Sequence, residues 1–291
     1  MFEGFEEKKV GTSGAAINLV VGGNGPPLLL LHGYPQSHVM WHKVAPRLAQ
    51  DFTVVAADLR GYGDSDKPGG DPEHYTYSKR AMARDQVEAM ESLGFTTFYL
   101  AGHDRGARVS HRLTKDNPER VLKLATLDII PTHRMFHIVN KEMAANTFHW
   151  FFLIQPYDFP ERVIGADADY FIRHSFQRGE NWQEVFPEEA ISEYVRCSTE
   201  PATIHAICED YRAGASIDLV HDEEDFANKV TCPHLVLWSD RGYVGRTQDV
   251  LGVWSDYSNN AGGHSMPSGH YIAEELPEET CVELRDFFLA P

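Results

Sequence analysis

The stretch Tyr99-Leu-Ala-Gly-His-Asp-Arg-Gly-Ala-Arg108 decides the fold. It contains Gly102-x-Asp104-x-Gly106 between a strand-like apolar run and a helix-like segment. This spacing matches the nucleophile elbow G-x-S-x-G, with aspartate in the position of the serine. The glycines are needed because the chain turns sharply there, and a Cβ on either side of the strained nucleophile would clash. A plain turn capped by Asp104 is the simpler explanation, but the motifs around it favour the elbow.

An aspartate in this position predicts different chemistry from a serine. A carboxylate is ionised at neutral pH, whereas a hydroxyl needs a base to become nucleophilic. Attack on an ester carbonyl would give a reactive mixed anhydride. Attack on a saturated carbon gives an ordinary ester and expels a leaving group. Asp104 therefore indicates displacement at an sp³ carbon, either dehalogenation or epoxide opening.

Short apolar runs alternate with helical patterns on both sides of the elbow. Such runs are typical of strands buried on both faces of a sheet. The segment 78–93 is one of the helical patterns, with Met82, Val87 and Met90 on one side. This alternation predicts an α/β fold with a parallel, doubly wound sheet. The five strand-like runs are residues 27–31, 52–57, 97–101, 122–127 and 234–238.

The middle of the chain interrupts this alternation. Residues 131–225 are rich in aromatic and acidic residues and have helical patterns, and the strands resume at Val230. We therefore expect a core domain of residues 1–130 and 226–291 and an inserted helical cap of residues 131–225. Ligands of open parallel sheets bind at the carboxyl ends of the strands. The pocket is expected between core and cap.

Two loops near the elbow complete the core motifs. His-Gly-Tyr-Pro at 32–35 follows the first buried run, where enzymes with a nucleophile elbow build half of their oxyanion hole from a backbone N–H. The expected donors are the N–H groups of Tyr34 and Arg105. The glycine and proline also fit a tight turn, which does not compete with this role. We interpret the loop DLRGYGDS at 58–65 as structural.

A general base is expected in the last loop, before the final helix. His264 and His270 are the candidates, and His270 is favoured because a good helix start follows it at residues 274–279. His264 is interpreted as an ordinary loop histidine. The acid that orients His270 is either Asp128 or Asp240, because each follows a predicted strand and both loops reach the same edge of the sheet.

Two arginines follow the nucleophile. Arg105 and Arg108 are three residues apart, so they share one face of a helix that begins at Arg105. Guanidinium groups stay charged and bind carboxylates through paired hydrogen bonds. They are therefore candidates for holding an anionic substrate. From the spacing alone, ordinary ion-paired helix arginines are an equally good explanation.

Composition excludes several classes of partner. The 291 residues carry a net charge of −17, which repels nucleic acid. The four cysteines form no C-x-x-C pair, so we expect reduced thiols without a metal site or disulfides. The N-terminus has no basic start followed by an apolar run, and the densest apolar stretch, 148–154, is too short for a membrane. We expect a cytoplasmic protein with no membrane contact.

The motifs taken together resemble the fluoroacetate dehalogenases of the α/β-hydrolase superfamily. The motifs HGYPQSHVMW and DLRGYGDSDKP are shared with epoxide hydrolases and haloalkane dehalogenases, whereas the Asp-Arg-x-x-Arg run joined to a His-Trp pair is more specific. The matching motifs are HGYPQSHVMW, DLRGYGDSDKP, GHDRGARVSHRL, LDIIPT, FHWFFLIQP, EDYRAGA and SGHYIAEELPEE, from about residue 33 to 279.

This resemblance implies a complete site. It makes Asp104 the nucleophile and His270 the base, and its acid follows the strand after the elbow, which selects Asp128 over Asp240. It also implies a carboxylate clamp and a halide pocket made of donor side chains, which an imidazole, an indole and a phenol supply. The clamp residues are Arg105 and Arg108, and the halide-pocket residues are His149, Trp150 and Tyr211. Without the resemblance, these three would be a buried aromatic cluster and a packing tyrosine.

The implied reaction is hydrolysis of haloacetates, such as fluoroacetate and chloroacetate, to glycolate and halide through an aspartyl ester. No metal or organic cofactor is expected, and relatives of this kind imply a homodimer. Tyr34 departs from the family, in which phenylalanine is expected. The alternatives are an epoxide hydrolase, a dehalogenase of larger 2-haloacids or neutral haloalkanes, and a ligand-binding protein that keeps the fold without catalysis.

Overall fold

The protein is built around one eight-stranded sheet with the strand order β1-β2-β4-β3-β5-β6-β7-β8. The structure, a computed structural model, describes residues 1–177 and 182–291. Strands β4 to β8 and β3 pair in parallel, whereas β2 pairs antiparallel with both β1 and β4. The strands are β1 (Glu6–Gly11), β2 (Ala16–Gly22), β3 (Pro27–Leu31), β4 (Thr53–Ala57), β5 (Phe98–His103), β6 (Val121–Leu127), β7 (His234–Ser239) and β8 (Ala261–Met266).

The predicted α/β fold with a mostly parallel sheet is confirmed. Each of the five apolar runs corresponds to one of the strands β3 to β7, and the helical pattern 78–93 corresponds to helix α2 (Lys79–Ser92). Ser78 caps α2 because its side chain accepts a hydrogen bond from the N–H of Ala81. The core helices are α1 (Ala45–Leu48), α2, α3 (Arg105–Asp116), α13 (Tyr243–Thr247), α14 (Val250–Trp254), α15 (Ile272–Glu275) and α16 (Pro277–Leu289), with 3₁₀ turns at His38–Trp41 and Tyr75–Tyr77.

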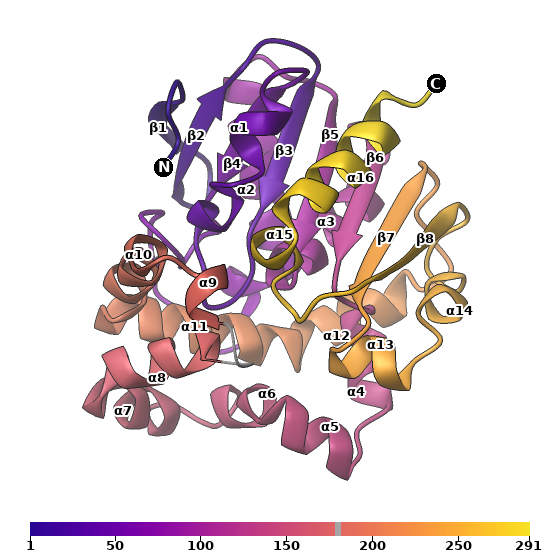
Figure 1. Ribbon diagram of the computed structural model, residues 1–291. Helices are drawn as coiled ribbons and strands as arrows, with labels where there is room; N and C mark the ends of the chain where they lie inside the picture. The colour runs from indigo at the N-terminus through magenta and orange to yellow at the C-terminus, as the bar shows by residue number, and fades with distance from the viewer. Residues whose placement is uncertain (178–181) are drawn as a thin grey trace.

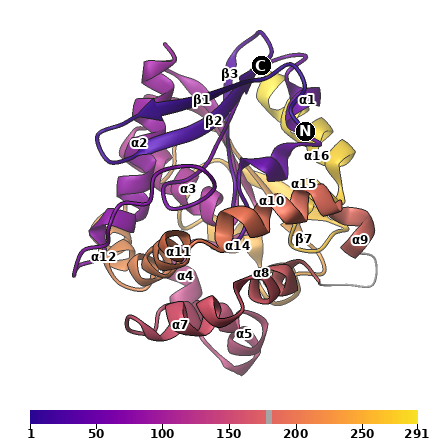
Figure 2. The same ribbon diagram turned by 90° about the vertical axis from the view of Figure 1, so that its left-hand side faces the viewer.

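The segment between β6 and β7 forms helices that lie beyond the carboxyl end of β6, below the sheet in Figure 1, and Figure 2 shows them in the same place from the side. Residues 178–181, which belong to the expected cap, lie outside the described residues. The helices are α4 (Thr132–His137), α5 (Lys141–Asn146), α6 (Phe148–Leu153), α7 (Phe159–Ala166), α8 (Ala168–Phe176), α9 (Trp182–Val185), α10 (Glu188–Ser198), α11 (Pro201–Gly214) and α12 (Ile217–Glu224).

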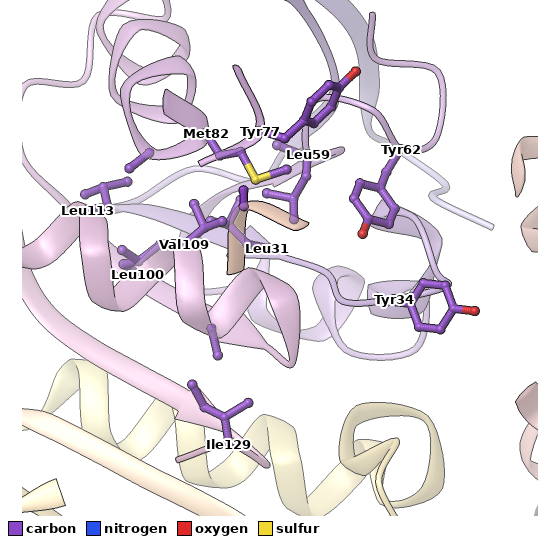
Figure 3. Packing of buried hydrophobic residues seen from close by; sticks show 14 of the residues in the cluster. Leu31, Tyr34, Leu59, Tyr62, Tyr77, Met82, Leu100, Val109, Leu113 and Ile129 are labelled. Atoms are coloured by element: carbon purple, nitrogen blue, oxygen red, sulfur yellow. The ribbon is translucent and has the colours of Figure 1, made fainter. Parts of the chain in front are cut away.

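The continuous apolar run of β3 is explained by a core on both faces of the sheet. Leu29 and Leu31 pack in one buried cluster, whereas Leu28 and Leu30 pack in another. Successive side chains of a strand point to opposite faces, so a central strand needs an apolar residue at every position. Figure 3 shows Leu31 close to Leu100 and Val109 in the first cluster. These three side chains link β3 and β5 to helix α3, which carries the arginines that follow Asp104.

Among the described helices, none has the length and apolar character that a membrane crossing requires.

Candidate active site

Asp104 lies at the turn between β5 and α3 with φ 47° and ψ −115°. Few residues other than glycine adopt a positive φ, so the turn is strained as a nucleophile elbow requires. A Cβ on Gly102 would lie 2.5 Å from the Ser110 Oγ, and one on Gly106 would lie 2.3 Å from the His32 carbonyl oxygen. Both glycines are therefore required by close packing.

The carboxylate of Asp104 is buried and faces two predicted partners. Its Oδ1 accepts a hydrogen bond of 2.9 Å from the backbone N–H of Tyr34, and its Oδ2 lies 3.8 Å from the His270 Nε2. Burial opposes ionisation, but the charges of His270 and Arg108 outweigh it and hold the pKa of Asp104 below its usual range. The carboxylate is thus ionised at neutral pH. The N–H of Arg105, the other expected oxyanion donor, is in the first turn of α3, where backbone N–H groups have no partner within the helix.

His270 and Asp128 meet at the carboxyl edge of the sheet. The His270 Nδ1 lies 2.6 Å from the Asp128 Oδ2, and the Asp128 Oδ1 accepts a hydrogen bond of 2.8 Å from the Ser239 N–H. Asp240 is instead about half exposed and lies 3.8 Å from the Arg241 Nε. The structure therefore brings Asp128, and not Asp240, to His270.

His264 lies away from this group. It is on strand β8, and its Nε2 is 3.3 Å from the Glu283 carboxylate at the surface. The expectation that it is a loop histidine is wrong, because β8 pairs in parallel with β7 through this residue. The glycine-rich stretch 261–266 has little of the apolar pattern by which sequence identifies a strand.

His103 touches the site but was not singled out from the sequence. It is fully buried, and its Nε2 donates a hydrogen bond of 2.7 Å to the carbonyl oxygen of His270. Burial and the neighbouring His270 lower the pKa of His103 to about 4, so the ring is neutral at pH 7. It ties the loop of His270 to the nucleophile strand. The available signal was its place next to Asp104 in the G-x-D-x-G pattern.

Arg108 is on the cavity wall. Its Nη1 donates to the Ile130 carbonyl at 2.9 Å and to the Thr132 Oγ1 at 3.1 Å, and its guanidinium lies 4.7 Å from the centre of the Trp150 ring. Among the residues that the structure describes, no carboxylate forms an ion pair with it, and its Nε is buried without a hydrogen-bond partner. Burial lowers the pKa of Arg108 to about 10, so the group is still charged at neutral pH.

Arg105 has a different environment from that of Arg108. Its Nε and Nη2 donate to the Asp210 carboxylate at 2.8 and 2.6 Å, and its side chain does not line the cavity. Burial opposes the charge, but Asp210 raises the pKa of Arg105 above its usual range. A guanidinium occupied in this way has fewer donors to offer to a ligand.

The three residues predicted for a halide pocket lie together. His149 and Trp150 of α6 line the cavity, and the ring of Tyr211 in α11 lies 5.8 and 6.0 Å from theirs, edge to face. Tyr34 stacks on His149 with the ring centres 5.6 Å apart. The Tyr211 hydroxyl is buried and has no hydrogen-bond partner among the described residues. A buried O–H without an acceptor is costly, so an acceptor is expected to reach it.

The cavity has a volume of about 650 Å³ and lies between the sheet and the helices that follow β6. Its wall combines charged groups from the core with aromatic groups from the inserted segment. The lining residues that matter for the chemistry are Asp104, Arg108, Asp128, His149, Trp150 and His270.

An aspartate on a strained elbow, a paired histidine and a parallel sheet define a hydrolase that works through a covalent ester. Residues 26–275 match the model of the alpha/beta hydrolase fold. The chain belongs to the alpha/beta hydrolase fold family.

Three relatives cover nearly all of the chain. A fluoroacetate dehalogenase of Burkholderia sp. is 48% identical over 288 residues, 99% of this chain and 95% of the relative, which confirms the resemblance seen in the motifs. A soluble epoxide hydrolase of Corynebacterium sp. (strain C12) is 34% identical over 286 residues, 95% of this chain and 94% of the relative. A protein of Nostoc sp. PCC 7120 of known crystal structure is 54% identical, with a TM-score of 0.98 over 100% of both chains.

Proposed function

We propose that the protein is a hydrolytic dehalogenase that converts fluoroacetate and chloroacetate to glycolate and halide through an ester of Asp104. One observation carries the proposal: an ionised nucleophilic carboxylate and a buried arginine without a described carboxylate partner line the same cavity. Together they suit a substrate with an anionic end and an electrophilic saturated carbon. The 48% identity to a fluoroacetate dehalogenase supports the same conclusion.

The first step is displacement at carbon. Arg105 and Arg108 bind the substrate carboxylate, and the Oδ2 of Asp104 attacks the α-carbon from the side opposite to the halogen. The new C–O bond forms as the carbon–halogen bond breaks, and the halide leaves with the bonding electron pair. Fluoride is a poor leaving group, so donors must meet its charge as it develops. We assign this role to His149, Trp150 and Tyr211.

The second step is hydrolysis of the glycolyl ester. The Nε2 of His270 takes a proton from a water molecule, which attacks the carbonyl carbon of the Asp104 ester. Asp128 orients the ring and stabilises the imidazolium that forms. The N–H groups of Tyr34 and Arg105 stabilise the oxyanion. The acyl C–O bond then breaks, the His270 imidazolium gives its proton to the leaving alkoxide oxygen, and glycolate leaves. Asp104 and neutral His270 are regenerated without a metal or an organic cofactor.

Halide and glycolate release from fluoroacetate and chloroacetate tests the proposal, measured beside diol formation from styrene oxide. Release of fluoride supports the full proposal. Chloride without fluoride keeps Asp104 and Arg108 in their roles but removes the halide role of the aromatic group. Diol formation alone contradicts the proposal and identifies the protein as an epoxide hydrolase. In that case Arg108 has no anionic group to bind.

The cavity volume favours a second candidate, a dehalogenase of larger 2-haloacids. A haloacetate has few non-hydrogen atoms, whereas cavities of about 300–1,000 Å³ hold drug-sized ligands. The cavity volume of about 650 Å³ falls in that range. Comparison of kcat/KM for chloroacetate with that for 2-chloro acids of increasing size separates the two. If kcat/KM is highest for a longer 2-chloro acid, the protein is a dehalogenase of larger 2-haloacids.

We also propose that the protein is a cytoplasmic homodimer with a core of residues 1–130 and 226–291 and a cap of residues 131–225. All four cysteines are free thiols, as expected for a reducing compartment. The proposal of a dimer rests on the resemblance to the family. Light scattering coupled to size-exclusion chromatography measures the mass in solution, and a monomer at micromolar concentration excludes the dimer.

A further inference from the structure

The loop that carries His270 leads directly into helix α15, and the carboxylate of Glu275 in this helix turns back to the loop. Its Oε2 accepts a hydrogen bond of 2.5 Å from the Gly269 N–H, and its Oε1 accepts one of 3.0 Å from the Tyr271 N–H. These two N–H groups flank His270 in the chain. One carboxylate therefore holds the backbone on both sides of His270.

Two peptide groups beside His270 are bound at both their C=O and their N–H. In the first, the Ser239 Oγ donates to the Ser268 carbonyl at 2.5 Å, and Glu275 accepts from the N–H. In the second, the His103 Nε2 donates to the His270 carbonyl at 2.7 Å, and Glu275 again accepts from the N–H. The carbonyls are thus tied to the ends of strands β5 and β7, whereas both N–H groups depend on Glu275.

A helix cap accounts for only one of these two bonds. Tyr271 is the N-cap residue of α15, and in a capping box the third residue after the N-cap reaches back to its N–H. That residue is Glu274, whose carboxylate instead accepts from the Tyr194 hydroxyl at 2.9 Å. Glu275, one position later, bonds the N-cap N–H and also that of Gly269, two residues before the cap. This second bond acts on the loop.

The place of Glu275 in the cavity wall also needs a reason. It lines the cavity together with Asp104 and His270. A carboxylate there repels an anionic substrate, so its presence must bring another benefit. Hydrogen bonds from N–H groups to a carboxylate are stronger than those between neutral groups. A Cβ on Gly269 would lie 2.7 Å from the Glu275 Oε1, so the carboxylate is packed directly against the loop.

We infer that Glu275 is a positioning residue for His270: it holds the backbone of the loop so that the imidazole keeps its place between Asp128 and the ester of Asp104. This inference rests on the proposed function. It assigns Glu275 to ester hydrolysis alone, because displacement at carbon does not use the base. A shift of a catalytic group by about 1 Å can lower a rate by about 100-fold.

Single turnovers with the protein in excess over chloroacetate separate the two steps. Chloride appears with displacement and glycolate with hydrolysis of the ester, so acid-quenched samples give both rates, whichever step limits kcat. We expect Glu275→Ala, which removes both hydrogen bonds, to slow glycolate release by about tenfold or more and to change chloride release less than about threefold. Glu275→Gln keeps one acceptor oxygen and should slow glycolate release by about three- to tenfold.

The matched control is Asp249→Ala. The carboxylate of Asp249 caps another short core helix, α14, by accepting a hydrogen bond of 3.0 Å from the Gly252 N–H. Asp249 is not among the described residues that line the cavity. Its replacement removes a helix cap of similar size far from the loop of His270, and both rates should stay within about twofold of the wild type.

An unchanged rate of glycolate release in Glu275→Ala overturns the inference and leaves the proposed function intact. Equal slowing of both rates also overturns it, because Glu275 would then support the whole site and not the base. If Glu275→Ala does not fold, Glu275→Gln decides, and it must slow glycolate release while sparing chloride release. Wild-type protein that releases no chloride contradicts the proposed function and overturns this inference with it.

Discussion

The Oδ2 of Asp128 lies 2.6 Å from the Nδ1 of His270, on the far side of the ring from Asp104. This contact keeps the proton on Nδ1, so the lone pair of the imidazole is on Nε2, where it can accept a proton. The Nε2 is 3.8 Å from the Asp104 Oδ2, which is too long for a direct hydrogen bond. That position suits activation of a water molecule beside the ester better than activation of Asp104, which is already ionised.

Replacement of Asp128 by asparagine tests this relationship. Asp128→Asn should lower kcat by about 100-fold or more, because the ring loses its orienting carboxylate and the imidazolium loses its counter-charge. The matched control is Asp240→Asn, which removes the other acid that sequence spacing allowed. Steady-state chloride release measures both. Equal loss in the two variants would show that Asp128 has no special relation to His270.

His270→Asn should stop the reaction at the covalent intermediate. Displacement by Asp104 does not need the base, whereas hydrolysis of the ester does. Intact-protein mass spectrometry after incubation with chloroacetate should show one added glycolyl group and a single burst of chloride. His264→Asn, on the exposed β8, serves as the control and should turn over normally. Normal turnover by His270→Asn would mean that another group is the base.

Strands β3 to β7 were predictable because they are buried on both faces of the sheet. Continuous apolar runs such as Pro27–Leu31 follow directly from that burial. Strands β1, β2 and β8 were not identified. β1 carries the sequence EEKKVG and is largely exposed, and β8 contains two glycines. Edge strands need no apolar run, so their pairing is decided by the neighbouring strand.

The site was predictable where its residues are close in sequence. Asp104 and its glycines form one motif, whose spacing carries the geometry. The choice between Asp128 and Asp240 was open because both loops end at the same sheet edge, and residue spacing does not specify which loop turns toward His270. The partner of Arg105 could not be identified from the sequence for a similar reason, since Asp210 is 105 residues away and in the inserted segment.

Arg108→Leu should weaken binding of the substrate carboxylate. A hydrogen bond to a charged group contributes about 1.5–3 kcal/mol, so kcat/KM for chloroacetate should fall by about 10- to 100-fold, mainly through KM. The control is Arg241→Gln, because Arg241 also lines the cavity but its side chain is 69% exposed. An exposed charge is screened by solvent, and a change below about threefold is expected. A larger effect of Arg241→Gln would indicate that the substrate carboxylate binds nearer to Arg241, toward the cavity mouth.

Glu274 joins the core to the inserted segment through hydrogen bonds of its buried carboxylate. It is fully buried just beyond the catalytic loop, and its carboxylate accepts hydrogen bonds from the Tyr194 hydroxyl at 2.9 Å and from the Gln36 side-chain amide. Burial raises the pKa of Glu274 to about 8, although both donors oppose the shift. The folded protein therefore prefers the protonated side chain, whereas the unfolded chain ionises it at an ordinary pH.

Glu274→Gln should make the protein more stable than the wild type at alkaline pH. Below the unfolded value of 4.5, Glu274 is protonated in both states and its burial has no ionisation cost; this advantage is lost as pH rises through about 8. The variant minus wild-type difference in unfolding free energy should rise across this window with a slope of at most about 1.4 kcal/mol per pH unit. Urea unfolding at several pH values measures it, with the exposed Glu278→Gln as control. A difference that does not change with pH would mean that folding does not shift the pKa of Glu274.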